Sequence, residues 1–291
     1  MTLSNLFKGA IYLSLAASIW GGMYVVSKFA LDTIPPFTLL FLRYLTASLF
    51  LVFICWQRKE LTLPRQNRGL LFQIGFIGYF LSIAAQFVGT KLSSAHMGAV
   101  ITTLSPVFLS LFAVFLLKER MSFKQLMSMA VAFAGVMIVI GGGGGDSTLG
   151  GNISLLLAAL FWGYYSVLSR KASADHSSLE ITTWGILVAT ILTLPTIFFE
   201  WQAWSMKDLL QGPILLSVLY IGLVATALAF FSWNKGLSLL PSHQAGPFFF
   251  LQPVVGSLLG WLFLNEHLTP SFFLGSLFIL AGVYFNMRQR D

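Results

Sequence analysis

The sequence contains ten apolar stretches, each long enough to cross a lipid bilayer and joined by short connections. They fall at 9–28, 36–56, 69–89, 94–117, 124–141, 152–169, 179–199, 212–234, 242–264 and 270–287. A helix crosses the hydrocarbon core in roughly 20 residues. The stretches are apolar all round and lack the period-two alternation of a transmembrane barrel. The pattern therefore predicts an all-α membrane protein with ten transmembrane helices.

Composition supports a lipid environment. Charged residues make up 9% of the chain and mean hydropathy is +0.82, whereas soluble domains carry about 25% charged residues. The net charge of +7 indicates membrane topology and no nucleic-acid partner, because the basic residues lie between the apolar stretches. The single cysteine, Cys55, excludes an intrachain disulfide. The first stretch follows Lys8 like a signal peptide but runs unbroken to Lys28, so we interpret it as a retained helix.

The distribution of basic residues predicts the orientation. If the N-terminus is cytoplasmic, 13 of the 17 lysines and arginines lie in cytoplasmic connections. The outer connections then carry only Lys28, Lys91 and Lys207. Positive charge marks the cytoplasmic side of membrane proteins. We therefore expect both termini in the cytoplasm, which requires an even number of helices.

The two halves of the chain resemble each other. Trp20-Gly21 recurs as Trp162-Gly163, 142 residues later, and Pro106 recurs as Pro253, 147 residues later. We predict a first five-helix repeat over 9–141, a glycine-rich linker over 142–151 and a second five-helix repeat over 152–288. Five helices in each half would insert the halves in opposite directions. Such inverted-topology repeats are typical of secondary transporters.

These motifs resemble the EamA family of the drug/metabolite transporter superfamily. Its pattern has a Trp-Gly early in the first helix of each repeat, and a proline followed by a glutamate in the fourth. Arg43 resembles the arginine of the family's second helix, whereas the second half has Gly185 at the equivalent position. Any role of Arg43 is therefore confined to the first half and is not repeated in the second. The resemblance covers roughly 9–288 and also implies that helices one, three, four, six, eight and nine line a central cavity, with helices five and ten outside.

The resemblance implies export of small metabolites across the bacterial cytoplasmic membrane by alternating access. The aromatic, neutral cavity walls favour a small amphipathic or zwitterionic solute such as an amino acid. A channel-like facilitator for small neutral solutes is the alternative. We expect no enzyme and no cofactor, because the sequence contains no metal-ligand cluster and no nucleophile–base pair. The expected partners are a small-molecule substrate and the lipid bilayer.

Two prolines predict where the cavity lies. Pro106 and Pro253 fall near the middle of the fourth and ninth helices, where a proline leaves a carbonyl without its helical partner. Polar neighbours of these prolines are candidate substrate contacts: Thr102, Thr103, Ser105 and Gln252. The alternative is that both prolines are packing kinks.

Aromatic residues and one arginine complete the candidate substrate-binding set. Trp20 and Trp162 lie at mid-depth, where an indole N–H needs a partner; they would stack on substrate or pack beside their glycines. Tyr24, Tyr79 and Tyr165 are further candidates. Arg43 is the only charge well inside a predicted helix and is costly there. It would bind a substrate carboxylate or phosphate, or serve a structural role. The structural role is favoured, because the family that this chain resembles retains the arginine while its members carry varied substrates.

Four further residues are candidates for gating or for structural roles. His96 and His243 open the fourth and ninth helices, and Glu119 and Glu266 end them. The histidines could sense protons, or simply start helices at the membrane interface. The glutamates are expected to fix the tight turns that follow. No acidic residue falls in the middle of a predicted helix, so transport is either facilitative or proton-coupled through histidine or an interfacial group.

One glycine motif bears on oligomeric state. Gly256-Ser257-Leu258-Leu259-Gly260 permits close helix packing. Such packing would occur within the chain or between two copies in a homodimer, and the motif does not distinguish the two.

Overall fold

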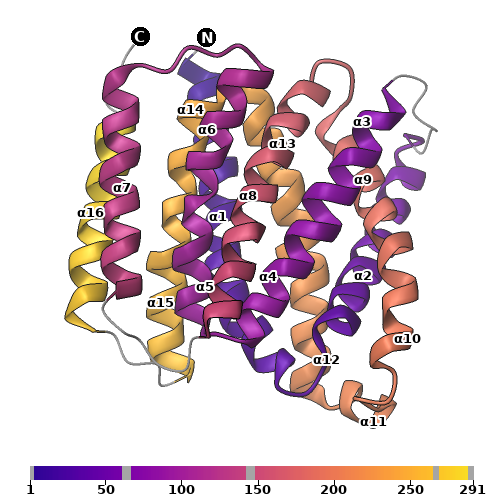
Figure 1. The fold of residues 1–291 in the computed structure, drawn as a ribbon. Coiled ribbons are helices and arrows are strands. Elements are labelled where there is room, and N and C mark those ends of the chain that lie inside the picture. The colour runs from indigo at the N-terminus through magenta and orange to yellow at the C-terminus, as the bar shows by residue number, and fades with distance from the viewer. Residues whose placement is uncertain (1–2, 61–66, 142–147, 265–268, 288–291) are drawn as a thin grey trace.

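The computed structural model describes residues 3–60, 67–141, 148–264 and 269–287, and these residues are helical apart from short connections (Figure 1). Five helices are continuous and long: α1 (Leu3–Leu31), α2 (Pro36–Gln57), α7 (Phe123–Gly141), α8 (Leu149–Ala172) and α16 (Pro270–Met287). The remaining rods are built from consecutive segments. These are α3 (Arg68–Gln73), η1 (Ile74–Leu81) and α4 (Ser82–Lys91); α5 (Ala95–Ile101), η2 (Thr102–Leu104) and α6 (Ser105–Leu116); α9 (Ser178–Thr193), η3 (Leu194–Thr196) and α10 (Ile197–Glu200); α12 (Gly212–Leu219), η4 (Tyr220–Leu228) and α13 (Ala229–Leu239); and α14 (Ser242–Ala245), η5 (Gly246–Phe250) and α15 (Leu251–Leu264). A short helix, α11 (Met206–Leu209), lies between α10 and α12.

The prediction of an all-helical, multi-span protein with about ten helices is confirmed. Within the described ranges, 7 helices are long and apolar enough to cross a membrane, and two shorter apolar helices follow at Phe248–Leu264 and Pro270–Gly282. The first helix begins earlier than predicted, at Leu3, and α8 extends the predicted sixth helix at both ends. We call the side where α1 begins and α16 ends the terminal side, and the opposite one the far side (Figure 1).

Within the described ranges, five rods change helix type along their length, two through π-helical segments and three through 3-10 turns. The segments η1 and η4 are π-helical and occupy the third rod of each half. Turns of 3-10 helix precede Pro106 and Pro253, at η2 and η5. Proline has no N–H to donate to the carbonyl of the preceding turn. The α-helical hydrogen-bond pattern is therefore interrupted before each proline, and it resumes at Ser105 and at Leu251. π-Helical turns are rare and frequently lie at functional sites.

The central rods form two groups of three. In the α1 group, α1 packs against the rods that contain α13 and α15; in the α8 group, α8 packs against the rods that contain α4 and α6. Because α1 begins on the terminal side and α8 ends there, the two helices run in opposite directions (Figure 1). α7 and α16 pair at one edge of the molecule, as the family resemblance implied for helices five and ten.

Glycines allow the closest helix contacts, and they do so in pairs. A Cβ added at Gly21 would lie 2.7 Å from Val255 Cβ, and one at Gly163 would lie 2.6 Å from Phe108 Cβ. Val255 and Phe108 are 147 positions apart, so the same contact occurs in both groups. Gly256 packs internally, since its added Cβ would lie 2.8 Å from Ala99 Cβ.

Candidate functional site: a central cavity between two helix groups

A narrow cavity of about 20 Å³ lies between the α1 group and the α8 group. Its wall is built by side chains from both groups and by one arginine of α2. These are Trp20, Met23, Tyr24, Arg43, Ser82, Ile83, Gln86, Thr102, Ser105, Ala158, Trp162, Phe230, Phe249 and Gln252. A space of this size holds about one water molecule. A metabolite therefore does not fit in this conformation.

The cavity has an aromatic wall. The rings of Trp20 and Trp162 meet edge to face, with centroids 5.1 Å apart, and Phe230 lies within 5.7 Å of both. Trp20 Nε1 donates to the carbonyl of Ala225 at 3.0 Å. Trp162 Nε1 is buried and has no hydrogen-bond partner among the described residues. The two tryptophans are thus equivalent in sequence but not in bonding.

Arg43 is fully buried at the cavity wall. Its Nε donates to Thr226 Oγ1 at 2.6 Å and its Nη2 to the Ala225 carbonyl at 3.4 Å. Both partners lie in η4, so the π-helical segment provides the acceptors. The guanidinium carbon also lies 5.3 Å from the ring centroids of Phe87 and Phe230, a distance at which aromatic faces attract cations.

A group of neutral polar side chains lies in the same cavity wall as this arginine. Tyr24 Oη and Thr102 Oγ1 are 2.6 Å apart, and Gln86 Nε2 donates to Tyr24 Oη at 2.5 Å. Gln86 Oε1 is buried and accepts no hydrogen bond from any described residue. The cavity thus combines aromatic surface, one cation and neutral polar groups.

Seven of the ten candidate substrate-binding residues line this cavity, and Tyr79, Thr103 and Tyr165 do not. Thr103 Oγ1 instead donates back to the Val100 carbonyl at 2.5 Å. Sequence reasoning missed the following lining residues: Met23, Ser82, Ile83, Gln86, Ala158, Phe230 and Phe249. The polarity of Gln86 within an apolar stretch could have identified it. Phenylalanines give no such signal because they also fill ordinary helix contacts.

Tyr79 and Tyr165 belong to a buried polar network centred on Asn234. Asn234 Oδ1 accepts hydrogen bonds from Tyr165 Oη and Ser169 Oγ, both at 2.6 Å. Its Nδ2 donates to Tyr79 Oη at 3.1 Å and to Thr182 Oγ1 at 2.8 Å. One amide thereby joins four helical rods and fixes their relative positions.

Replacing Asn234 with leucine is expected to lower the free energy of unfolding by about 2–4 kcal/mol. Each buried polar group left without a partner costs about 1–3 kcal/mol, and the surviving hydroxyls can rebond only in part. Thermal unfolding in detergent measures the effect. T182V removes one of the four contacts and serves as the milder control. Equal stability of N234L and the unmodified protein would contradict this role.

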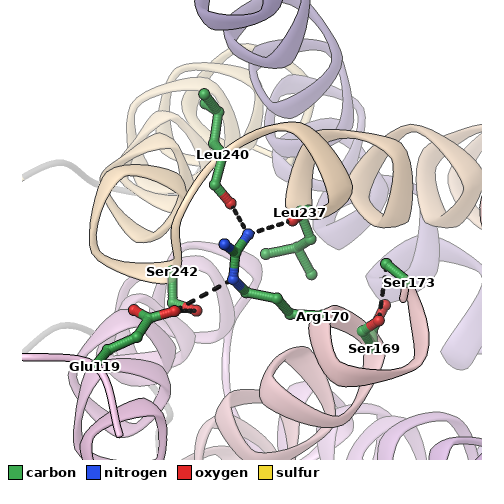
Figure 2. A network of polar contacts seen from close by, with 7 residues as sticks. All are labelled: Glu119, Ser169, Arg170, Ser173, Leu237, Leu240 and Ser242. Atoms are coloured by element: carbon green, nitrogen blue, oxygen red, sulfur yellow. Dashed lines mark hydrogen bonds and ion pairs between the residues drawn. The ribbon is translucent and has the colours of Figure 1, made fainter. Parts of the chain in front are cut away.

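On the terminal side, Arg170 at the end of α8 makes a network of polar contacts with the α1 group (Figure 2). Arg170 Nη1 donates to the carbonyl of Leu237 at 2.7 Å and to that of Leu240, where α13 ends. Arg170 Nε lies 3.2 Å from Glu119 Oε1, which also accepts from Ser242 Oγ at 3.2 Å. We call this set the terminal-side contact; it joins the α8 group to the α1 group.

On the far side, Lys28 makes the corresponding contact at the end of α1. Lys28 Nζ donates to the carbonyls of Thr90 at 3.3 Å, Lys91 at 3.1 Å and Ser93 at 2.6 Å, where α4 ends. Lys91 Nζ in turn donates to the Leu31 carbonyl at 3.2 Å. We call this set the far-side contact; it joins the α1 group to the α8 group.

The two contacts are equivalent in the two halves. Lys28 and Arg170 are 142 positions apart, the offset of the two tryptophans. Thr90 and Leu237, and likewise Ser93 and Leu240, are 147 positions apart. In each case a cation binds carbonyls at and just beyond the C-terminal end of a helix, where the helix dipole is negative. The two helix groups are therefore joined on opposite sides by the same chemistry.

The remaining candidates are placed as follows. Pro106 is near the start of α6 and Pro253 near the start of α15, directly after the 3-10 turns. His96 lies in α5 and His243 in α14, but their side chains are outside the described part of the structure. Glu266 and residues 142–147 of the predicted linker are also outside the described residues. Glu119 contacts Arg170 and Ser242, while its predicted role in the turn that follows stays a prediction.

Oppositely directed helix groups around a central cavity are typical of multi-pass membrane transporters. The family comparison agrees: the EamA-like transporter family model matches residues 7–141 and 149–288, so the chain belongs to the EamA-like transporter family and is not an enzyme.

Among similar proteins, the uncharacterized transporter YetK of Bacillus subtilis is 28% identical over 94% of this chain and 85% of its own length. A probable amino-acid metabolite efflux pump of Escherichia coli is 26% identical over 96% of this chain and 95% of its own. A solved crystal structure superposes with a TM-score of 0.77 at 20% identity and covers 95% of each chain, which indicates a shared fold.

Proposed function

We propose that this protein is a secondary transporter that exports small metabolites, amino acids among them, across the bacterial cytoplasmic membrane by alternating access. Its halves would form an inverted-topology repeat with both termini in the cytoplasm. The observation that carries the proposal is the pair of equivalent contacts that join the two helix groups on opposite sides, made by Arg170 and Lys28.

The equivalence matters because alternating access needs two gates of similar strength. If one contact breaks while the other holds, the cavity opens to one side only. Because the contacts use related residues in oppositely directed helices, exchanging their states costs little net free energy. A continuously open channel would not require two closures of this kind.

The choice of amino acids as a substrate class is supported by two features. Of the fourteen side chains that line the cavity, five are aromatic, five are neutral and polar, and one is an arginine. Relatives in Escherichia coli and Salmonella typhimurium are named probable amino-acid metabolite efflux pumps. A small amphipathic solute suits such a wall better than a polyanion.

Substrate counterflow in proteoliposomes tests the proposal. Vesicles loaded with unlabelled amino-acid pools should accumulate the labelled solute transiently above its external concentration. Empty vesicles with the same lipid, and vesicles loaded with a non-transported sugar, serve as controls. Flux down the gradient without counterflow would contradict alternating access and favour a channel-like facilitator.

A further inference from the structure

The cavity wall contains a buried cation that pairs with no anion among the described residues. Arg43 is 0% exposed, and it makes no ion pair with any described residue. Its Nη1 is buried and donates no hydrogen bond within the described part of the chain. The acceptors that it does have, Thr226 and Ala225, are neutral.

A buried, uncompensated charge is destabilising. Transfer of an ion from water into a protein interior costs several kcal/mol even after relaxation, and a donor left unpaired adds to that. Aromatic faces at 5.3 Å compensate the charge only in part. A buried group left unsatisfied in a native structure calls for an explanation, and binding of a ligand is one.

Two more unsatisfied groups lie in the same wall. Trp162 Nε1 is a donor without an acceptor, and Gln86 Oε1 is an acceptor without a donor, among the described residues. The equivalent tryptophan, Trp20, has its N–H bonded to Ala225. The unsatisfied groups are therefore not a general property of the repeat. They comprise a charged donor, a neutral donor and a neutral acceptor around one cavity.

We propose that the transported solutes carry a single carboxylate, which Arg43 Nη1 binds by a charge-assisted hydrogen bond, with an apolar body against the aromatic wall. The inference rests on the proposed transport function and narrows its substrate class. Trp162 Nε1 supplies a second donor to the solute. Gln86 Oε1 accepts from an amine where the solute has one.

Arg43 has no cationic counterpart in the second half, so the cavity can pair with only one anionic group of the solute. At the equivalent position of the second half, Gly185 is packed so closely that an added Cβ would lie 2.6 Å from Tyr79 Cε2. No second cation lines the cavity among the described residues. A dicarboxylate or a phosphate ester would leave negative charge unpaired, which a low-dielectric site disfavours.

Ligand binding to the purified protein tests the substrate class separately from transport. The probes are acid and amide pairs of one shape: L-leucine against L-leucinamide, and 4-methylpentanoate against 4-methylpentanamide. Isothermal titration in detergent measures the affinities. We expect each acid to bind at least about tenfold more tightly than its amide, because hydrogen bonds to charged groups exceed neutral ones by about this factor.

Variants at Arg43 assign the selectivity to this residue. R43Q should abolish the preference for acids, and R43K should restore part of it. K171Q removes an exposed charge near the end of α8 and should leave the preference unchanged. Size-exclusion profiles and helical circular dichroism establish that each variant is folded. Equal binding of acids and amides, or unchanged preference in a folded R43Q, would overturn the proposal.

Trp162 provides a second test if R43Q does not fold. W162F keeps an aromatic ring and removes an N–H that has no partner within the described residues, so folding should persist while affinity for acids falls several-fold. W20F is the matched control, because the Trp20 N–H is already bonded within the protein. This variant should have a lower melting temperature, and its affinity for acids should fall less than that of W162F. Failure of all acids to bind would reject the substrate class, even if counterflow of other solutes established transport. Arg43-dependent binding without counterflow would support the anion site and reject the transport proposal.

Discussion

Replacing Arg170 with glutamine is expected to open the central cavity toward the terminal side of the membrane. The change removes the charge that holds the carbonyls of Leu237 and Leu240 and the carboxylate of Glu119. Hydrogen bonds to charged groups contribute about 1.5–3 kcal/mol each. A loss of this size shifts the equilibrium by about 10–100-fold toward the state that is open to the terminal side. The far side should stay closed, because Lys28 is unchanged.

Cysteine accessibility measures this shift. C55S removes the only native cysteine, which is buried, and S105C then places a single thiol in the cavity wall. A membrane-impermeant maleimide is applied to inside-out vesicles, in which the proposed orientation exposes the terminal side, and to right-side-out cells. R170Q should raise labelling from the terminal side at least about tenfold and leave or lower labelling from the far side.

Two controls make this result specific. K171Q, at the neighbouring position, should leave labelling unchanged, and R170K should give an intermediate value. K28Q should produce the opposite pattern, with increased labelling from the far side. Equal labelling of R170Q and the parent from both sides would refute the gating role of Arg170. Increased labelling from both sides would instead indicate general loosening.

The second large effect is expected at the tryptophan-adjacent glycines. Replacing Gly163 with alanine should lower the free energy of unfolding by about 1–3 kcal/mol, the usual penalty for overpacking. The added Cβ would lie 2.6 Å from Phe108 Cβ and 2.7 Å from the Leu109 backbone nitrogen. A backbone atom cannot move without displacing α6, so α8 and α6 must separate.

Thermal unfolding in detergent compares G163A with two matched variants. G21A places a Cβ 2.7 Å from Val255 Cβ and 2.9 Å from the Gln252 carbonyl, so it should be destabilised similarly. G150A lies on the same helix as Gly163, but an added Cβ there has no neighbour within 4 Å. The melting temperature of G150A should equal or slightly exceed that of the parent protein, because alanine stabilises a helix more than glycine does. A melting temperature of G163A equal to that of G150A would contradict the close-packing argument.

The sequence predicted the helices well, because each helix in a bilayer must be apolar over roughly 20 residues and carry its own hydrogen bonds. Both ends of α2, of α16 and of the rod from α14 to α15 lie within one residue of the predicted ends. Matching Trp-Gly and proline motifs indicated a repeat. The π-helical segments η1 and η4 were not predicted, since no residue type marks them.

The cavity was predicted only in part. Trp20, Trp162 and Arg43 were recognised because large polar-tipped or charged side chains at mid-depth need a partner. Tyr79 and Tyr165 looked equally suitable but lie in the Asn234 network. Which face of a helix a tyrosine occupies depends on the neighbours of that helix, and a stretch that is apolar all round has no polar face to indicate it.

The sequence by itself determined that this chain is a membrane protein of about ten helices with two related halves, because lipid imposes its constraint on each helix separately. Only the tertiary structure decided which cation joins the two helix groups on which side, and that Arg43 has no anion beside it among the described residues. Those features depend on side chains far apart in the chain meeting in space, as Trp20 meets Ala225 across 205 positions. Such meetings follow from how the helices pack, and a linear pattern of hydropathy and motifs does not record that packing.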